Sequence, residues 1–380
     1  MRIIDRYLLR EFLQTFAICF LSLTGVYVVF DAFTNLEAFL HCAKGWQLFR
    51  VLVSYYGFQS IFFFDRTSSL LVLMSAMFTM AWIQRHNEMT ALMAAGVSRI
   101  RIVAPVIVAG IVITVLAAVN RETLMPRFKD QLAQRPGDLR GNAADEGPFL
   151  CDHQTGVILQ GKATYAGEGR IEKPDFLLPR TLNAYGNQLV AANAYYRPPS
   201  GSRPGGYLLC DVQEPRNLAK KPSLVLEGRP VLLTPRDAPD WLGPQQCFLV
   251  SDVTFDQLTG GRAFRMFAST AEMIRALGNR AMDYGADIRV TIHSRIVQPL
   301  LDLTLLFLGL PLIVSRESRN VFMAIGLCMG VVAFFLVLVI GCQQLGTLNV
   351  PGYPPALAAW TPLMIFVPAA VGTAESMWKR

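Results

Sequence analysis

The sequence has few charged residues and no recognisable catalytic motif. Only 17% of the 380 residues are Asp, Glu, Lys or Arg, whereas 52% are hydrophobic and the mean hydropathy is +0.36. This composition is not typical of a soluble enzyme. No Walker A sequence, Gly-x-Ser-x-Gly motif or His-Glu-x-x-His motif is present. If the protein uses ATP, another chain must hydrolyse it.

Histidine and paired cysteine are also scarce. One of the four histidines, His153, follows Cys151 and Asp152. Neighbours in an extended strand point to opposite faces, so a surface loop is predicted here rather than a nucleophile and its base. The seven cysteines form no C-x-x-C motif. One disulfide among Cys151, Cys210, Cys247 and the nearby Cys42 is possible, but the sequence does not indicate the pairing.

Six long apolar segments are present. Each is about twenty residues long, which is the length that a helix needs to cross a hydrocarbon core about 30 Å thick. We expect the first to be retained rather than cleaved as a signal peptide. The segments are residues 12–30, 67–83, 102–119, 296–314, 321–342 and 357–372.

Basic residues at the ends of these segments predict the orientation. They gather where both termini and two short connections would face the cytoplasm, which leaves residues 120–290 in the periplasm. The residues are Arg2, Arg6, Arg10, Arg85, Arg99, Arg101, Arg316, Arg319, Lys379 and Arg380. The net charge of +7 partly reflects this bias, and attraction to anionic lipid is the alternative that stays open. No basic and aromatic platform suggests a nucleic-acid partner.

The polar middle of the chain reads as β-rich. Short segments of strand character alternate with Pro and Gly turns, at 156–160, 175–178, 188–192, 206–212, 223–226, 230–233 and 247–254, and a helix is predicted at 270–282. We expect Ile158, Leu189, Leu208, Val225 and Leu232 to face inward. The predicted fold is an α-helical integral membrane protein with six transmembrane helices and an inserted all-β, jellyroll-like domain. The predicted domains are 1–119, 120–290 and 291–380.

A short soluble-looking helix lies between the second and third apolar segments. The sequence QRHNEMTALMAAGVS occupies residues 84–98, where Asn87 is expected to cap the helix and Gly96 to end it. Met89, Leu92 and Met93 fall on one face. A capped helix that joins two spans, here residues 86–97, is typical of the surface that ABC-type permeases present to an ATPase.

Several polar residues lie in or near the apolar segments. Asp65 and Arg66 are about 18 residues before the end of the second segment, so they lie roughly 27 Å from it, near the outer interface. They are predicted either as a neutralised pair or, alternatively, with Arg66 lining a cavity for an anionic ligand. Asp302 is within the fourth segment, where a charge costs about 2.5–3.5 kcal/mol, and Arg295 is a possible partner. The candidate substrate-binding residues are Asp65, Arg66, Arg127, Lys129, Arg295 and Asp302.

These features together resemble the lipopolysaccharide-export permease family LptF/LptG (YjgP/YjgQ). The matching residues are IDRYLLRE at 4–11, NEMTALMAAGVS at 87–98, and Glu122 with Pro126 after the third segment. The IDRY opening and Phe30-Asp31 slightly favour the LptG-like member. The resemblance implies a periplasmic β-jellyroll and a paralogous permease subunit, with a cavity that opens laterally between the first and fifth spans.

The resemblance also implies partners and residue roles. The expected partners are a cytosolic LptB-like ATPase dimer, a single-span LptC-like protein, an LptA-like bridge protein and lipopolysaccharide. No cofactor is expected on this chain, since ATP and Mg would be held by the ATPase. The ATPase-coupling residues would be Asn87, Glu88, Thr90, Ala91, Leu92, Ala95 and Gly96. The lateral gate would include Phe20, Tyr27, Phe30 and a small-residue step of Gly326 and Gly330, which permits a close helix crossing.

Three functions are weighed. The first is a permease subunit that extracts lipopolysaccharide, or a related glycolipid, from the inner membrane for export. The second is a mechanotransmission or efflux permease that moves no lipid; such permeases usually have fewer spans and a large domain after the first. The third is a membrane enzyme that modifies lipids, which would need clustered His, Asp or Glu at an interface. Co-purification with a second permease and an ATPase would best distinguish them.

Overall fold

The structure is a computed structural model of the chain. It describes residues 3–42, 45–134, 136, 145–147, 149–165, 168–179, 186–200, 203–216, 220–226, 228–237, 241–259, 261–279, 285–314, 321–348 and 353–378. The chain divides into two compact units. The membrane unit comprises residues 1–36, 49–132 and 285–380, and the β unit comprises residues 37–48 and 133–284.

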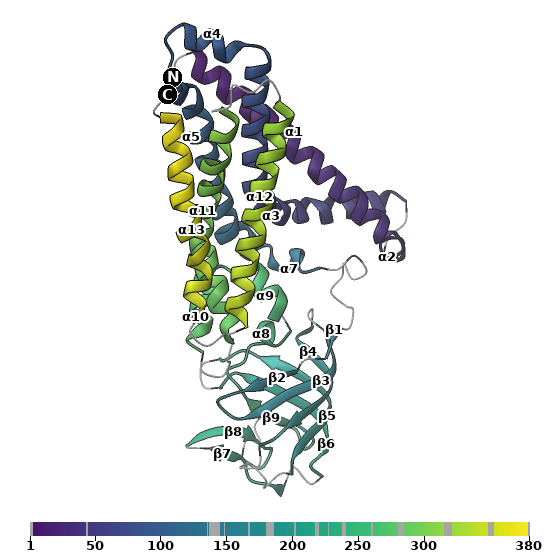
Figure 1. Ribbon diagram of the computed structural model, residues 1–380. Helices are drawn as coiled ribbons and strands as arrows, with labels where there is room; N and C mark the ends of the chain where they lie inside the picture. The colour runs from purple at the N-terminus through teal and green to yellow at the C-terminus, as the bar shows by residue number, and fades with distance from the viewer. Residues whose placement is uncertain are drawn as a thin grey trace. The chain divides into compact units, whose positions relative to one another are not determined.

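Six helices of the membrane unit are long and apolar enough to cross a bilayer, as the sequence predicted. They are α1 (Ile3–Thr34), α3 (Trp46–Arg85), α5 (Arg99–Val119), α11 (Gly285–Val314), α12 (Val321–Thr347) and α13 (Pro355–Trp378). Figure 1 shows that α1 begins and α13 ends at the end of the bundle that carries the short helix α4 (Glu88–Ala94). Of the basic residues used to predict orientation, Arg2, Arg316, Arg319, Lys379 and Arg380 lie outside the described residues.

Glycines let three of these helices approach closely. A Cβ atom on Gly110 of α5 would lie 2.8 Å from Leu306 Cδ2 of α11 and 3.1 Å from Val72 Cγ1 of α3. A Cβ atom on Gly309 of α11 would clash with Leu73 of α3. In lipid there is little hydrophobic drive between helices, so close backbone packing of this kind stabilises the bundle.

The helical path does not stop at the end of α5. It continues through a π-helix, η1 (Asn120–Leu124), into α6 (Met125–Arg127) and then α7 (Lys129–Leu132). These segments group with the membrane unit, as does the start of α11. The remaining short helices are α2 (Leu36–Cys42), α8 (Phe255–Thr259), α9 (Gly261–Phe267) and α10 (Thr270–Leu277). A capping box formed by Ser269 and Glu272 begins α10, where a helix was predicted.

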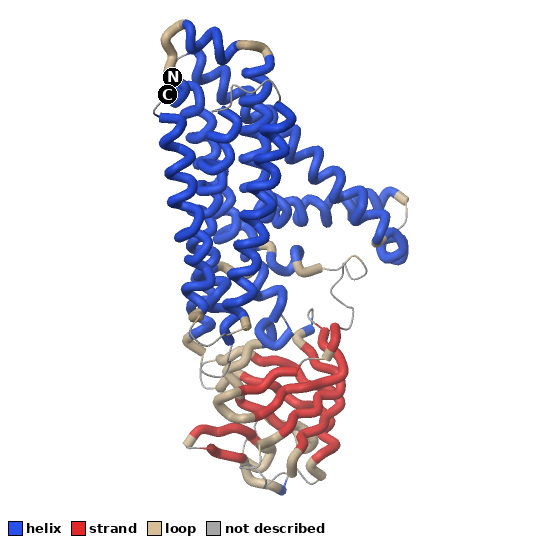
Figure 2. Tube along the Cα trace, viewed as in Figure 1, coloured by secondary structure: helices blue, strands red, loops and turns tan. Residues whose placement is uncertain are grey.

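The β unit contains one antiparallel sheet, shown in red in Figure 2. Its strands are β1 (Asp145–Glu146), β2 (Phe149–Asp152), β3 (Val157–Tyr165), β4 (Arg170–Leu177), β5 (Gln188–Arg197), β6 (Gly206–Glu214), β7 (Leu224–Leu226), β8 (Arg229–Leu233) and β9 (Cys247–Val250). The order is β1-β3-β4-β5-β6-β9-β8-β7, and β2 pairs with β3. The predicted inserted all-β domain is confirmed. All seven predicted strands are present, and β1 and β2 were not predicted.

Three of the five side chains expected to face inward do not. Leu189 and Leu232 are fully buried as predicted. Ile158 and Leu208 are only half-buried, and Val225 is 58% exposed. In β3 and β6 the buried positions are instead the neighbours of Ile158 and Leu208, which are Val157, Leu159, Tyr207 and Leu209.

The error has a simple physical origin. A shift of one residue moves every side chain of a strand to the other face. The runs Val157-Ile158-Leu159 and Tyr207-Leu208-Leu209 are apolar at consecutive positions, so they show no alternation that could select the buried face.

Candidate functional site

Helix α4 lies at the turn between α3 and α5. Asn87 holds its N-cap position but makes no side-chain cap bond, so the predicted cap is wrong. Its backbone is left-handed, with φ of 58°, a conformation that Asn tolerates better than most residues. This geometry allows α3 to turn directly into α4. Gly96 is left-handed as predicted, with φ of 81°, and its N–H donates to the Met93 carbonyl oxygen at 2.9 Å.

The two faces of α4 differ in their exposure. Met89 is buried and Leu92 and Met93 are half-buried, and all three pack on the core of the membrane unit. The face with Thr90, Ala91 and Ala95 is exposed. The helix is therefore fixed by its apolar side and presents small and polar groups outward.

Glu88 makes a contact that the sequence did not predict. Tyr7 Oη of α1 donates to Glu88 Oε2 at 3.0 Å and lies 3.3 Å from Oε1. The two residues are 81 positions apart in the chain. Tyr7 lies within the IDRY sequence, but nothing in that sequence indicates its partner.

A cluster of charged residues lies where α3, η1 and α11 meet. This polar cluster consists of Asp65, Arg66, Arg121, Glu122 and Arg295. Arg121 Nε of η1 donates to Asp65 Oδ1 of α3 at 2.8 Å, and the two side chains are only 14% and 7% exposed. The predicted pair of Asp65 with Arg66 is therefore wrong. Adjacent residues of a helix do not face each other, and the Arg66 guanidinium lies instead over the Phe62 ring, 5.3 Å from its centroid.

The π-helix η1 places Arg121 against α3. The Asn120 side chain, buried beside it, donates from Nδ2 to the Ile61 carbonyl oxygen of α3 at 3.0 Å. A π-turn carries one extra residue per turn and is often found at functional sites. Because helical periodicity in the sequence does not reveal such a turn, Arg121 was missed as the partner of Asp65.

Asp302 takes its hydrogen bond from a different residue than expected. Gln298 Nε2 donates to Asp302 Oδ1 at 2.8 Å, one turn away on α11, whereas Arg295 was predicted as the partner. Arg295 lies in the field of Arg121, Glu122, Asp65 and Arg66. An amide four residues away on the same face satisfies the carboxyl more directly than a guanidinium two turns away.

The six predicted substrate-binding residues thus fall into two groups. Asp65, Arg66 and Arg295 belong to the polar cluster, and Asp302 is coupled electrostatically to Asp65 and Arg121 within it. Arg127 on α6 and Lys129 on α7 are exposed further along the chain.

Removing one member of the buried ion pair should destabilise the membrane unit. Arg121→Met leaves the Asp65 carboxylate, 7% exposed, without its charged partner, which typically costs about 3–5 kcal/mol. We expect a clear fall in the thermal unfolding temperature of the purified protein in detergent. The double variant Asp65→Asn/Arg121→Met removes both charges and should recover most of this loss. A single variant as stable as the wild type would show that the pair contributes nothing.

The predicted gate residues lie on α1 and α12. Phe20 of α1 packs edge-on against Phe64 of α3, with ring centroids 5.8 Å apart, and Tyr27 stacks on Phe63 at 5.1 Å. Phe30 is 72% exposed. On α12, Gly326 and Gly330 are exposed, and a Cβ atom on either would meet nothing within 4 Å. Among the described residues, the close helix crossing expected at this step is therefore not made.

Asp152 of the β unit has a structural role. Asp152 is buried and accepts hydrogen bonds from Ser251 Oγ at 2.7 Å and from the Gln154 N–H at 3.0 Å. His153 is exposed, as expected for a surface loop.

The cysteines of the β unit form no disulfide among the described residues. Cys151, Cys210 and Cys247 are free thiols, and the Cys42 side chain lies outside the described residues. Burial raises the pKa of Cys247 and of Cys210, which disfavours the thiolate form of both. Within the described residues, no three metal-ligating side chains come together.

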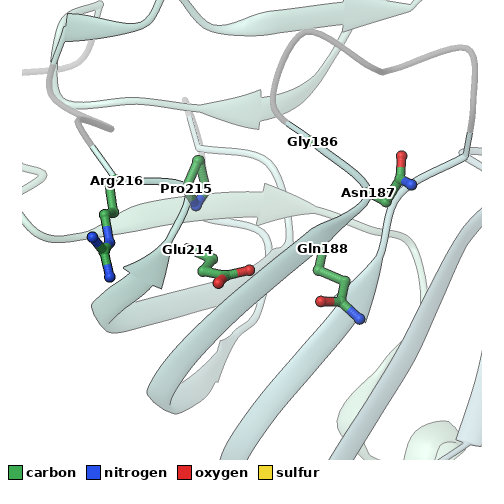
Figure 3. Close-up of a pocket in the computed structure, with 6 residues that line it drawn as sticks. All are labelled: Gly186, Asn187, Gln188, Glu214, Pro215 and Arg216. Atoms are coloured by element: carbon green, nitrogen blue, oxygen red, sulfur yellow. The ribbon is translucent and has the colours of Figure 1, made fainter.

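One open hollow of about 300 Å³ lies between the start of β5 and the end of β6. Figure 3 shows its six lining residues, which are Gly186, Asn187, Gln188, Glu214, Pro215 and Arg216. Pro215 is the one apolar side chain among them. An acyl chain needs an apolar wall, so this hollow does not fit one.

Comparison with known families shows what the chain is similar to. The sequence model described as "Lipopolysaccharide export system permease LptF/LptG" matches residues 6–170 and 233–375, which is most of the chain. The matched stretches contain α4, Tyr7 and the polar cluster. A search of curated proteins found no match.

Proposed function

Because the chain belongs to the LptF/LptG family of lipopolysaccharide export permeases, we propose that it is the subunit that extracts lipopolysaccharide, or a related glycolipid, from the inner membrane. It is a multi-pass membrane protein, and its β unit would pass the lipid to a β-jellyroll bridge for export. The observation that carries the proposal is the family match over both halves of the membrane unit.

The proposed orientation follows from the basic residues. Arg6, Arg10, Arg85, Arg99 and Arg101 lie on α1, α3 and α5 near the α4 end. We place this end in the cytoplasm and the β unit in the periplasm. The polar cluster would then lie towards the outer side of the membrane, where a phosphorylated headgroup would sit.

The exposed face of α4 is the proposed contact with a cytosolic LptB-like ATPase dimer. That partner would hold ATP and Mg, and this chain would bind no cofactor. A paralogous permease would complete the lateral gate, where the exposed Gly326 and Gly330 of α12 and the exposed Phe30 of α1 are free for contact with another chain. An LptC-like protein and an LptA-like bridge would join the β unit.

Two cationic side chains are the proposed headgroup ligands. Arg66 is exposed, and Arg295 belongs to the same cluster. Guanidinium groups bind phosphate with paired, charge-assisted hydrogen bonds. Arg127 and Lys129 would attract the phosphate groups of the headgroup over a longer distance.

The test is the identity of the lipid that stays with the purified complex. Mass spectrometry of the chain, isolated with its paralogue and its ATPase, should find lipopolysaccharide enriched several-fold over its share of membrane lipid. Phospholipids in the proportions of the membrane would favour the alternative, a mechanotransmission or efflux permease that moves no lipid.

A further inference from the structure

The buried side chains of helix α1 lie in its first turns, whereas its later contacts are with partly exposed rings of α3. Leu8 and Phe12 are the only buried residues among its thirty-two, and both belong to the core that contains Met89 of α4. We call residues 3–12 the foot of α1. Figure 1 shows α1 starting beneath α4 and then slanting away from α11 and α13 towards α2.

The hydrogen bond between Tyr7 and Glu88 lies at this foot. Tyr7 is 39% exposed, so its hydroxyl group, rather than burial of its ring, is its main link to α4. A carboxylate has about four acceptor sites, so Glu88 can accept from Tyr7 and still bind a cation of a partner protein. The residue proposed to meet the ATPase thus also contacts α1 directly.

Beyond the foot, α1 carries the proposed gate residues. Phe20 and Tyr27 pack on the aromatic rings of α3, and Tyr56 Oη of α3 donates to Asp31 Oδ2 at 2.8 Å. From Phe12 to Phe30 the helix rises roughly 27 Å, so a tilt of about 10° at the foot moves Phe30 by about 5 Å. A small tilt of α1 at its foot therefore displaces the gate residues by several ångströms.

We propose that the Tyr7–Glu88 contact joins α4 to the foot of α1, so that the two move as one body and ATPase-driven movement of α4 tilts the gate helix. Tyr7 is then a positioning residue for lipid export. This inference rests on the proposed function, because it takes α4 as the surface that the ATPase moves.

The test compares lipopolysaccharide release by two variants of Tyr7. The proposed mechanism predicts which of the two releases more. Tyr7→Phe keeps the ring but removes the donor, whereas Tyr7→Lys loses the ring but restores a donor of similar reach. In proteoliposomes of the full complex, we expect Tyr7→Phe to lower lipopolysaccharide release per ATP hydrolysed by at least threefold. Tyr7→Lys should retain more release than Tyr7→Phe, and ATPase rate and assembly should change less than twofold in both.

A matched control removes a tyrosine hydroxyl elsewhere. Tyr353 Oη donates to Thr361 Oγ1 at 3.0 Å near the start of α13, so Tyr353→Phe should leave release per ATP unchanged. If Tyr7 served only in packing, Phe would be tolerated better than Lys. That order, or wild-type release from Tyr7→Phe, overturns the inference while the proposed function stands.

A second measurement does not depend on lipid release. Spin labels at Leu13, one residue beyond the foot of α1, and at Ala94, both exposed, report the distance between this end of α1 and α4. Movement as one body predicts the same distance with and without ATP. A distance that changes with ATP overturns the inference even in a complex that exports lipid, and a wild-type complex that releases no lipopolysaccharide contradicts the proposed function instead.

Discussion

Glu88→Lys should abolish most lipopolysaccharide export while leaving the protein in the membrane. The substitution places a cation where the proposed ATPase contact requires an anion, and it replaces the acceptor of the Tyr7 hydroxyl with a donor. Both effects act on α4, whose apolar side remains packed through Met89. We expect at least a tenfold loss of co-purifying ATPase or of ATP-dependent export.

The control reverses the charge of an acid far from α4. Asp130 is exposed on α7, so Asp130→Lys tests whether any change of charge reduces export. Membrane insertion of both variants is followed by the amount of protein in washed membranes. Normal export by Glu88→Lys at normal levels of complex would contradict the proposal that Glu88 of α4 contacts the ATPase.

Replacing Arg66 and Arg295 together with Ala should reduce the lipid that co-purifies. The two residues lie on α3 and α11, and the field of Arg66 acts on Arg295. A single exposed contact to phosphate contributes little, whereas several that converge on one headgroup act together. We therefore expect the double variant to retain several-fold less lipopolysaccharide than the wild type, and less than either single variant.

Two other arginines of the same helices provide the matched control. Arg50 on α3 and Arg289 on α11 are exposed, so Arg50→Ala/Arg289→Ala removes the same charge elsewhere on the two helices. Assembly with the ATPase should be normal in both double variants. Unchanged lipid in Arg66→Ala/Arg295→Ala would mean that the arginines only anchor the protein at the interface and that the acyl chains hold the cargo.

The sequence predicted the elements of this fold better than their contacts. Apolar length is sufficient to find six spans, because a helix must be about twenty residues long to cross a bilayer. The left-handed turn at Gly96 was also predicted, since glycine adopts that conformation at little cost. In both cases the evidence is local to the segment.

The contacts that were missed depend on packing between distant segments. Arg121 reaches Asp65 from the π-helix η1, and Tyr7 reaches Glu88 across 81 positions of the chain. Gln298 competes with Arg295 for Asp302 by being closer on the same helix face. The inward faces of β3 and β6 were misassigned because both faces of these strands carry apolar residues.

The most direct test of the central claim is transfer of lipopolysaccharide from a membrane. Proteoliposomes would contain this chain, its paralogous permease, the ATPase, the LptC-like partner and lipopolysaccharide, and a soluble bridge protein with a photo-crosslinker would collect the released lipid. The account predicts crosslinked lipopolysaccharide that accumulates with ATP and is absent without ATP or without this chain. Equal labelling without ATP, or none while the ATPase is active, would contradict it.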